Sequence, residues 1–319
     1  MTGRALITGV TGQDGSYLAE RLLADGWTVH GLVHGAGERA VAGVHVHPGD
    51  VAEAGTFERL LPEVAPDVVF HLAGMSSVAQ SWREAARCAE VTGTAVARLL
   101  EACFGDGSSP GQGPRVVLAS SAEVFGAATS SPQDETTPVR PTSPYGAAKA
   151  FALHLGGVYR QAGHHVGAAI LYNHESPRRP HTFVTRKITT TVAGIVAGTA
   201  STLRVGNLEA RRDWGWAPDH VDALVRMAAA DTPDDYVVAT GVGHSVRELV
   251  AAAFAAAGVE DWEQLVQVDP ALVRPVDAVD LVGDARRIRD RLGWAPTVPF
   301  EEVVARMVRA DLHGGPGGA

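Results

Sequence analysis

Cysteine is scarce in this sequence. Only Cys88 and Cys103 occur among the 319 residues, and they show no CxxC spacing. A disulfide framework is therefore not indicated, and we expect two core thiols in a protein of a reducing compartment.

Long hydrophobic runs are also missing. No apolar stretch reaches about 18 residues, the length that a membrane-spanning helix needs. The chain does not open with a basic segment followed by an apolar one, which is the pattern of a secretory signal. We therefore expect a cytoplasmic protein with no membrane partner.

Positive charge is the third deficit. The chain has 27 Lys and Arg against 36 Asp and Glu, for a formal net charge of -9. Such a chain has no basic stripe with which to neutralise a phosphate backbone, so we expect no nucleic-acid partner. A small anionic ligand remains compatible, because its site needs only a few local arginines. The histidines show no metal-ligand spacing, so no metal site is predicted.

What the sequence does contain is a regular alternation of short apolar runs with amphipathic stretches through its first half. This pattern predicts βαβ units and an α/β fold with a Rossmann-type doubly wound parallel sheet. Beyond residue 173 the chain becomes polar and rich in arginine, which predicts a smaller C-terminal substrate-binding lobe. We assign 1–172 plus 214–242 to the dinucleotide-binding domain, 173–213 plus 243–312 to the smaller lobe, and 313–319 to a disordered tail.

A glycine-rich turn stands near the N-terminus. Gly9, Gly12 and Gly15 form a GxxGxxG pattern between an apolar run and a helical one. Glycine lets the backbone turn tightly and approach a pyrophosphate, which then lies at the positive end of the helix. The pattern predicts a dinucleotide site, to which Gln13 and Asp14 of the same turn would contribute.

The end of the second apolar run should meet the adenosine ribose. It carries His34, Glu38 and Arg39, so an acidic signal for NAD and a basic signal for NADP stand together and the choice stays open. Asp50 would either cap the next turn or hydrogen-bond the adenine amino group. Further cofactor contacts are expected from Val51, Leu72, Ala73 and Gly74.

The run SPYGAAK sets Tyr145 and Lys149 four residues apart, on one face of a predicted helix. A nearby ammonium group favours the ionised phenol, so we expect the pKa of Tyr145 to be lowered and its oxygen to act as a base. Lys149 would also hold the nicotinamide ribose. Ser121, directly after another apolar run, would hydrogen-bond the same substrate oxygen.

These motifs together resemble the extended short-chain dehydrogenase/reductase superfamily. Within it, the runs NHESPRRPHTFVTRKIT, GNLEARRDWGWAPDHVDAL and ATGVGHSVREL closely resemble GDP-mannose 4,6-dehydratases. The resemblance implies that Glu123 removes the proton from C5 of a 4-keto sugar and helps the C6 hydroxyl to leave. The hydride then returns to C6, giving a GDP-4-keto-6-deoxy sugar with no net change in the NADP or NAD cofactor.

The same resemblance assigns a set of residues to the GDP-sugar. They are Ser76, Asn173, Glu175, Arg178, Val184, Lys187, Gly206, Asn207, Arg212, Arg274 and Asp277. Lys187, Arg212 and Arg274 would meet phosphate oxygens, for which a guanidinium fork is well suited. Gly206 and Asn207 would lie near the guanine. From the residues alone, Arg178 and Arg179 stay open between a surface charge and a ligand contact.

The sequence departs from the family after its second apolar run, where HGAGERAVAGV is short and lacks the arginine pair that the family uses for the NADP phosphate and for tetramers. We therefore expect a homodimer, with a tetramer as the alternative. A GDP-sugar 4-epimerase acting on a hexose or heptose would use the same Ser121, Tyr145 and Lys149 and stays as the alternative activity. A nucleotide-binding regulator without turnover is a remote third interpretation.

Overall fold

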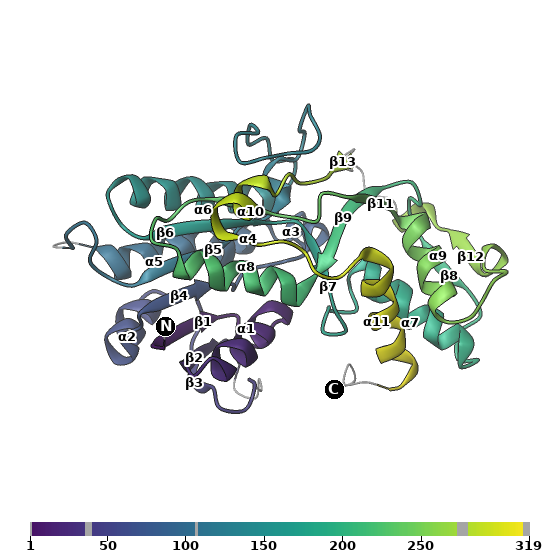
Figure 1. Cartoon of the computed structure of the whole chain (residues 1–319), viewed down its shortest axis with the longest axis horizontal. Helices are drawn as coiled ribbons and strands as arrows, with labels where there is room; N and C mark the ends of the chain where they lie inside the picture. The colour runs from purple at the N-terminus through teal and green to yellow at the C-terminus, as the bar shows by residue number, and fades with distance from the viewer. Residues whose placement is uncertain (1, 36–39, 106–107, 273–279, 315–319) are drawn as a thin grey trace.

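The computed structural model describes residues 2–35, 40–105, 108–272 and 280–314. A seven-stranded parallel sheet forms the larger lobe (Figure 1). Its strands are β1 (Arg4–Thr8), β2 (Thr28–Val33), β3 (His45–Pro48), β4 (Val68–His71), β5 (Arg115–Ala119), β6 (Val166–Leu171) and β10 (Tyr236–Val238). Their order is β10-β6-β5-β4-β1-β2-β3, with β1 and β4 adjacent where the order changes direction. This is a doubly wound sheet, as predicted.

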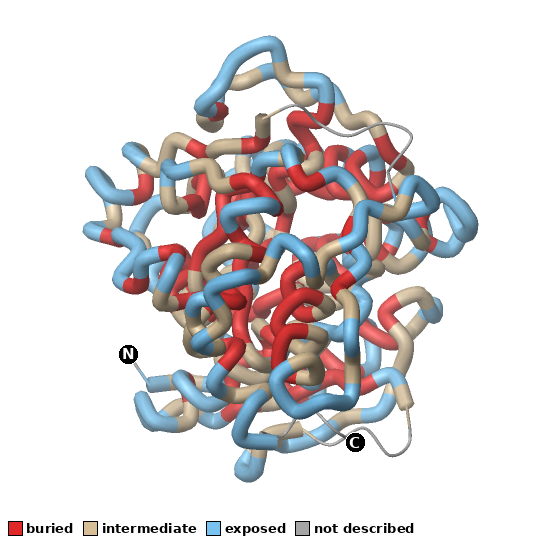
Figure 2. Tube along the Cα trace, turned by 90° about the vertical axis from the view of Figure 1, so that its right-hand side faces the viewer, coloured by how far each residue is buried: buried red, intermediate tan, exposed pale blue. Residues whose placement is uncertain are grey.

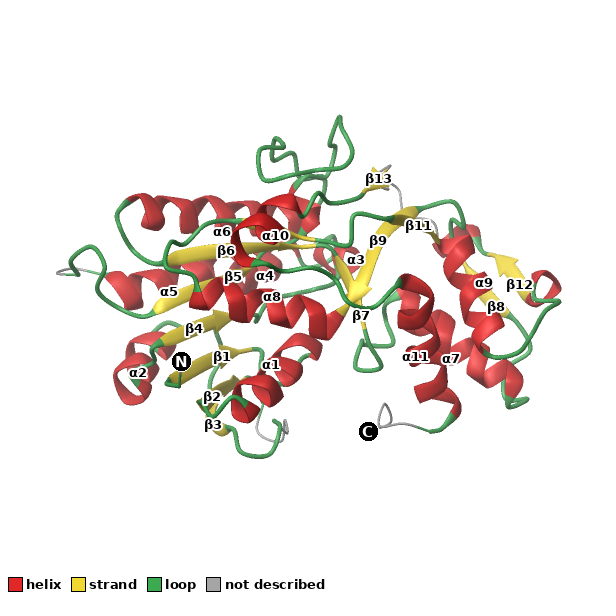
Figure 3. Ribbon diagram, viewed as in Figure 1, coloured by secondary structure: helices red, strands yellow, loops and turns green. Residues whose placement is uncertain are grey.

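Helices cover both faces of this sheet (Figure 3). The helical segments of this lobe are α1 (Gln13–Ala24), α2 (Thr56–Val64), α3 (Val78–Ser81), α4 (Ala85–Cys88), η1 (Ala89–Thr94), α5 (Ala95–Phe104), η2 (Ala122–Val124), α6 (Pro144–Gln161), α8 (Ala217–Ala229) and α10 (Arg286–Leu292). Alternate residues of a strand point to opposite faces. In β1, Leu6 packs in the cluster formed by α2, α5 and α6, whereas Ile7 packs in that of α1, α8 and α10. Figure 2 shows the buried positions gathered inside the molecule.

A smaller lobe carries the remaining elements. Its strands are β7 (Asn173–Glu175), β8 (Leu203–Val205), β9 (Arg211–Trp216), β11 (Gly243–Ser245), β12 (Val266–Val268) and β13 (Asp280–Leu281). Its helices are α7 (Val184–Val196), α9 (Val246–Ala256), η3 (Glu263–Leu265), η4 (Pro270–Leu272) and α11 (Phe300–Leu312). Strand β9 pairs with β7, β11 and β13, while β8 pairs with β12. Trp214, Phe254 and Phe300 belong to the separate core of this lobe.

The chain crosses between the lobes several times. Strand β9 runs directly into α8, which packs on the large sheet. After β13 the chain returns to the larger lobe, where Ile288 and Trp294 enter its core and the Trp294 indole donates to the Asp219 carbonyl at 2.8 Å. The domain boundaries stay a prediction. In the part of the chain that the structure describes, no helix is both long and apolar enough to traverse a bilayer.

Candidate active site

The predicted functional residues follow the carboxyl ends of the central strands. Gly9 comes after β1, Ala73 after β4, Ser121 after β5 and Asn173 after β6. Because neighbouring parallel strands end at the same edge of a sheet, these residues lie along one edge. Strand β7 of the smaller lobe continues from β6 at this edge, so the second lobe borders the same site.

The glycine-rich turn has a shape that other residues would not adopt. Gly9 has a φ of +71°, and a Cβ there would lie 2.9 Å from the backbone nitrogen of Ala73. A Cβ on Gly15 would lie 2.2 Å from the carbonyl oxygen of Gly9, so α1 and the turn pack backbone to backbone. Gly12 is exposed and caps α1 with extended backbone. This leaves an open cradle at a helix N-terminus, which fits the diphosphate of a dinucleotide.

At the predicted adenosine end, Asp50 has partners within the protein. Its Oδ1 accepts from the backbone nitrogen of Ala52 at 2.8 Å. Of the two roles expected for Asp50, this contact corresponds to capping the turn. Its Oδ2 accepts from Arg87 at 2.8 Å and lies 3.5 Å from His34 Nδ1. Burial acts against the charged carboxylate, but Arg87 and the Ala52 N–H hold its pKa below the usual value. Arg39 lies outside the described residues.

The other predicted cofactor residues are Val51, Leu72, Ala73 and Gly74. The Ala73 backbone nitrogen donates to the Thr8 hydroxyl at 3.1 Å, which ties the end of β4 to β1. Gly74 is exposed with a φ of +158°, Leu72 is half-buried and Val51 is buried.

Tyr145 and Lys149 share one buried face of α6, as their spacing predicts. Ser143 caps this helix through a hydrogen bond from the Gly146 nitrogen, and Pro144 follows at its first position. The Lys149 ammonium lies 5.9 Å from the centre of the Tyr145 ring and donates to the Ala119 carbonyl at 2.5 Å.

The expected lowering of the Tyr145 pKa is wrong for the protein by itself. Burial raises the pKa of Tyr145 to about 12, against the opposing hydrogen bond with Ser121, and the charge of Glu123 raises it further. Burial also lowers the pKa of Lys149 to about 8. The physical reason is that removing the phenolate from water costs more free energy than its interactions with the surrounding protein groups recover.

Ser121 and Glu123 reach the tyrosine through a tight packing of η2 on the start of α6. A Cβ on Gly146 would lie 2.6 Å from the Glu123 carbonyl oxygen, so only glycine lets the two segments approach this closely. Ser121 caps η2 and accepts from the Glu123 nitrogen at 3.3 Å. The Ser121 hydroxyl hydrogen-bonds Tyr145, and the half-buried Glu123 interacts electrostatically with it. The structure therefore brings all four predicted catalytic residues together.

The smaller lobe supplies the remaining predicted residues. Glu175 is buried and accepts from the Thr185 hydroxyl at 2.6 Å. Asn207 accepts from the Glu209 nitrogen at 3.0 Å in the turn after β8, and Arg212 is buried in β9. Half-buried or exposed positions are occupied by Asn173, Val184, Lys187 and Gly206 of this lobe, and by Ser76, which follows β4 in the larger lobe. Arg274 and Asp277 lie outside the described residues.

The two adjacent arginines point in different directions. Arg178 pairs with Glu20 at 2.6 Å and stacks on the Tyr17 ring at 3.9 Å, so it lies against α1. Arg179 lies 3.3 Å from Glu175 and stacks on Phe183 at 3.7 Å, and its charge acts on both Tyr145 and Asp14. Arg179 therefore lies within electrostatic reach of the site. Because the two arginines lie in an irregular segment, the sequence has no helical or strand periodicity from which their different positions could have been predicted.

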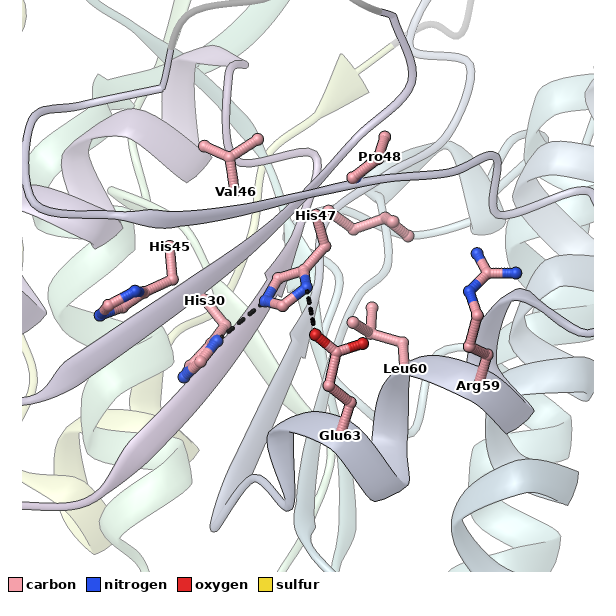
Figure 4. Close-up of a pocket in the computed structure, with 9 residues that line it drawn as sticks. His30, His45, Val46, His47, Pro48, Arg59, Leu60 and Glu63 are labelled. Atoms are coloured by element: carbon pink, nitrogen blue, oxygen red, sulfur yellow. Dashed lines mark hydrogen bonds and ion pairs between the residues drawn. The ribbon is translucent and has the colours of Figure 1, made fainter.

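A second group of titratable residues lies away from this site, at the outer edge of the sheet. His30 and His47 contact each other at 2.9 Å, and His47 lies 3.4 Å from Glu63 in the pocket drawn in Figure 4. Across the described ranges, no group of His, Cys, Asp and Glu has an arrangement that could hold a metal ion.

Known proteins similar to this chain bear on both fold and chemistry. A family model described as GDP-mannose 4,6 dehydratase matches residues 6–307. GDP-mannose 4,6 dehydratase 1 of Arabidopsis thaliana is 41% identical over 97% of this chain and 90% of its own length. The GDP-mannose 4,6-dehydratase of Vibrio cholerae is 39% identical over 98% of this chain and 94% of its own length.

Solved structures share the whole fold. The UDP-glucose 4-epimerase of Thermus thermophilus in complex with NAD has a TM-score of 0.84 at 29% identity, covering 98% of this chain and 99% of that one. RMD from Pseudomonas aeruginosa complexed with NADPH has a TM-score of 0.82 at 25% identity, covering 98% of this chain and 100% of that one.

Proposed function

We propose that this chain, which belongs to the GDP-mannose 4,6-dehydratase family, converts GDP-mannose into a GDP-4-keto-6-deoxy sugar. The observation that carries the proposal is the convergence of Ser121, Glu123 and Tyr145 in one site, with Lys149 behind them. This set holds both an oxygen that can exchange a proton with a sugar hydroxyl and a carboxylate that can act at the neighbouring carbons.

The first half of the reaction oxidises the sugar at C4. When bound, NADP or NAD supplies a hydride acceptor and a positive charge. Ser121 orients the C4 hydroxyl, and Tyr145 takes its proton as the carbon is oxidised. Because burial raises the pKa of Tyr145 to about 12 in the chain alone, formation of the phenolate that accepts this proton depends on nearby positive charge, which Lys149 supplies. Lys149, held at the end of β5 by Ala119, places a positive charge behind it.

The second half removes water. The 4-ketone makes the hydrogen on C5 acidic, and Glu123 accepts that proton and returns one to the departing C6 hydroxyl. A positioned acid–base group of this kind contributes about 10²–10⁴-fold to the rate. Glu123 is half-buried and lies within electrostatic reach of Tyr145, so one carboxylate serves the atoms next to C4.

The second lobe binds the GDP moiety in this proposal. Arg179 pairs with Glu175 within electrostatic reach of Tyr145, and Lys187 and Arg212 stand on α7 and β9. Guanidinium groups form paired hydrogen bonds with phosphate oxygens and tolerate burial. Gly206 and Asn207, in the turn after β8, would receive the guanine.

The cradle fits a dinucleotide, since Gly9 and Gly15 let the turn pack backbone to backbone against Ala73 and α1, and the exposed Gly12 leaves the N-terminus of α1 uncovered. The backbone N–H groups of Gln13 and Asp14 at the start of α1, next to Gly12, would hold its diphosphate. Asp50 and His34 would stand at its adenosine end, where the choice between NADP and NAD is made.

Two further expectations complete the proposal. Phe151 and Val158 are 50% and 59% exposed on α6, seven residues apart and thus on one face of the helix. A second copy of the chain would cover this apolar face, giving a homodimer. We also propose a cytoplasmic location.

The 4-epimerase alternative has less support. The curated relatives at 38–41% identity carry the dehydratase name, while the Thermus thermophilus epimerase stands at 29%. Incubation with GDP-mannose in deuterated water separates the two. A dehydratase gives a product that has lost one water and carries deuterium at C5, and an isomer of unchanged mass without that label would overturn the proposal.

A further inference from the structure

A histidine that the proposed chemistry does not use lies buried between the two lobes. His174 stands in the middle of β7. Its Nε2 lies 2.8 Å from Asp14 Oδ2 in the glycine-rich turn, and its Nδ1 lies 2.7 Å from the Tyr172 carbonyl oxygen at the end of β6. The ring therefore spans the phosphate cradle, the large sheet and the second lobe.

The partners of this ring define its charge. A carbonyl oxygen only accepts, so Nδ1 must donate, and a carboxylate also only accepts, so Nε2 must donate as well. Both nitrogens carry protons only in the imidazolium form. Burial opposes that charge, but the Asp14 carboxylate outweighs it, and the pKa of His174 is raised. The same contact, together with Gln13, lowers the pKa of Asp14 in spite of its burial.

The Gln13 amide group, at the same junction between α1 and β7, also has hydrogen-bond partners. The Gln13 amide nitrogen donates to Asp14 Oδ1 and to the His174 carbonyl, each at 3.1 Å. Its amide oxygen accepts from the Ser176 hydroxyl at 2.8 Å. The first turn of α1 is thus hydrogen-bonded to His174 in the middle of β7 and to Ser176 directly after this strand.

A second histidine supports the ring from behind. His220 of α8 stacks on His174 with ring centres 4.4 Å apart and planes 22° apart. Burial and then the His174 charge lower the pKa of His220 to about 3, so the pair holds one charge. A Cβ on Gly215 would lie 2.5 Å from His220 Cε1, so glycine in β9 leaves the space for the stack.

Other charges face the junction. Arg179, from the segment after β7, acts on both His174 and Asp14. The charge of Asp14 also reaches Lys149, whose pKa it raises against the effect of burial. An uncompensated carboxylate at this position would therefore oppose an anionic diphosphate in the cradle and alter the charge balance at the catalytic lysine.

We propose that His174 is a positioning residue, whose imidazolium cancels the charge of Asp14 in the diphosphate cradle and fixes strand β7 of the substrate lobe against that cradle. The inference rests on the proposed function only in taking the bound group to be a nicotinamide dinucleotide. It predicts that loss of the imidazolium impairs dinucleotide binding because Asp14 is left unpaired, so removing the carboxylate as well should restore binding.

The test uses the full chain freed of dinucleotide, with NAD⁺ and NADP⁺ each titrated by calorimetry. We expect His174→Gln to weaken the tighter of the two by about tenfold or more, the direction found when one partner of a buried charge pair is removed. The double variant Asp14→Asn with His174→Gln should bind more tightly than His174→Gln alone. His164→Gln is the matched control, since His164 is a buried histidine stacked on Phe104 at 4.4 Å, away from the site.

The charge is measured directly on the unmodified chain. Nitrogen NMR of ¹⁵N-histidine-labelled protein at pH 7 should show a ring with both nitrogens protonated, and this signal should vanish in His174→Gln. A neutral His174 tautomer, wild-type affinity in His174→Gln, or strictly additive losses in the double variant would each overturn the inference. If His174→Gln does not fold, the NMR spectrum of the unmodified chain tests the inference by itself. None of these measurements uses GDP-mannose turnover, so they stand apart from the test of the proposed activity.

Discussion

Lys149 Nζ lies 2.5 Å from the Ala119 carbonyl oxygen and 5.9 Å from the centre of the Tyr145 ring. The ammonium is therefore anchored to the end of β5, behind the phenol. Ser121 acts on the same phenol, whose pKa it lowers against the effect of burial.

Tyr145→Phe tests whether the phenol accepts the C4 proton. Without the hydroxyl no group accepts the C4 proton, so turnover of GDP-mannose should fall by about 10²-fold or more, while dinucleotide affinity changes little. Tyr159→Phe is the control, because Tyr159 lies on the same helix and packs in the core next to Phe104. Steady-state rates and calorimetric titrations provide the two readouts. Normal turnover in Tyr145→Phe would remove this residue from the mechanism.

Glu123→Gln separates oxidation from water loss. The amide cannot accept the C5 proton, so GDP-mannose should be oxidised without being dehydrated, and reduced nicotinamide should accumulate as an absorbance change near 340 nm. The exposed Glu90→Gln on η1 provides a control of the same chemical change. Dehydration at an unchanged rate in Glu123→Gln would mean that another base acts at C5.

Arg179→Ala and Arg178→Ala form a matched pair of adjacent substitutions. Arg179 pairs with Glu175 and its charge acts on Tyr145, whereas Arg178 pairs with Glu20 on the surface of α1. We expect Arg179→Ala to lower kcat/KM for GDP-mannose by about tenfold or more, as the loss of a charge-assisted contact would. Arg178→Ala should change it by less than about threefold. The reverse order in steady-state kinetics would make Arg178 the ligand contact.

The titration of Lys149 should appear in the pH dependence of stability. Its folded-state pKa is about 8, below the ordinary 10.5, so between these values the unfolded chain binds more protons than the folded one. The unfolding free energy therefore rises with pH in that window, by up to about 1.4 kcal/mol per pH unit, and the gain is lost as pH falls through 8. Urea unfolding at pH 7 to 10, taken as wild type minus Lys149→Met, should show this slope. A flat difference would place the lysine pKa near 10.5.

The proposed homodimer is tested by Phe151→Glu. A charge at this half-exposed position of α6 should be excluded from an apolar interface, giving a monomer in analytical ultracentrifugation. Val196→Glu, at a similarly exposed position on α7, should leave the sedimentation unchanged. A Phe151→Glu variant that sediments like the wild type would show that this face is not the interface.

Short sequence patterns predicted much of the candidate site. The spacing of Gly9, Gly12 and Gly15 predicts the turn whose backbone contacts the structure shows, and the four-residue spacing of Tyr145 and Lys149 predicts their shared face on α6. Both follow from the geometry of single elements, in which sequence distance translates into spatial distance.

Other features were beyond such patterns. Asp14 and His174 are 160 residues apart, and their contact exists only because β7 of the second lobe packs against the first turn of α1. The sequence also predicted the wrong direction for the shift of the Tyr145 pKa. That shift depends on how completely the folded chain excludes water from the phenol.

The order of residues by itself determined the parallel sheet, the dinucleotide turn and the helix that bears the tyrosine, since periodicity and glycine placement act within a few residues. Only the tertiary structure decided which of the two arginines pairs with Glu175 near the site, where the lysine ammonium is anchored, and that a histidine pairs with the carboxylate in the cradle. Electrostatic and burial energies depend on three-dimensional distance and on the loss of water, and neither can be obtained from spacing along the chain.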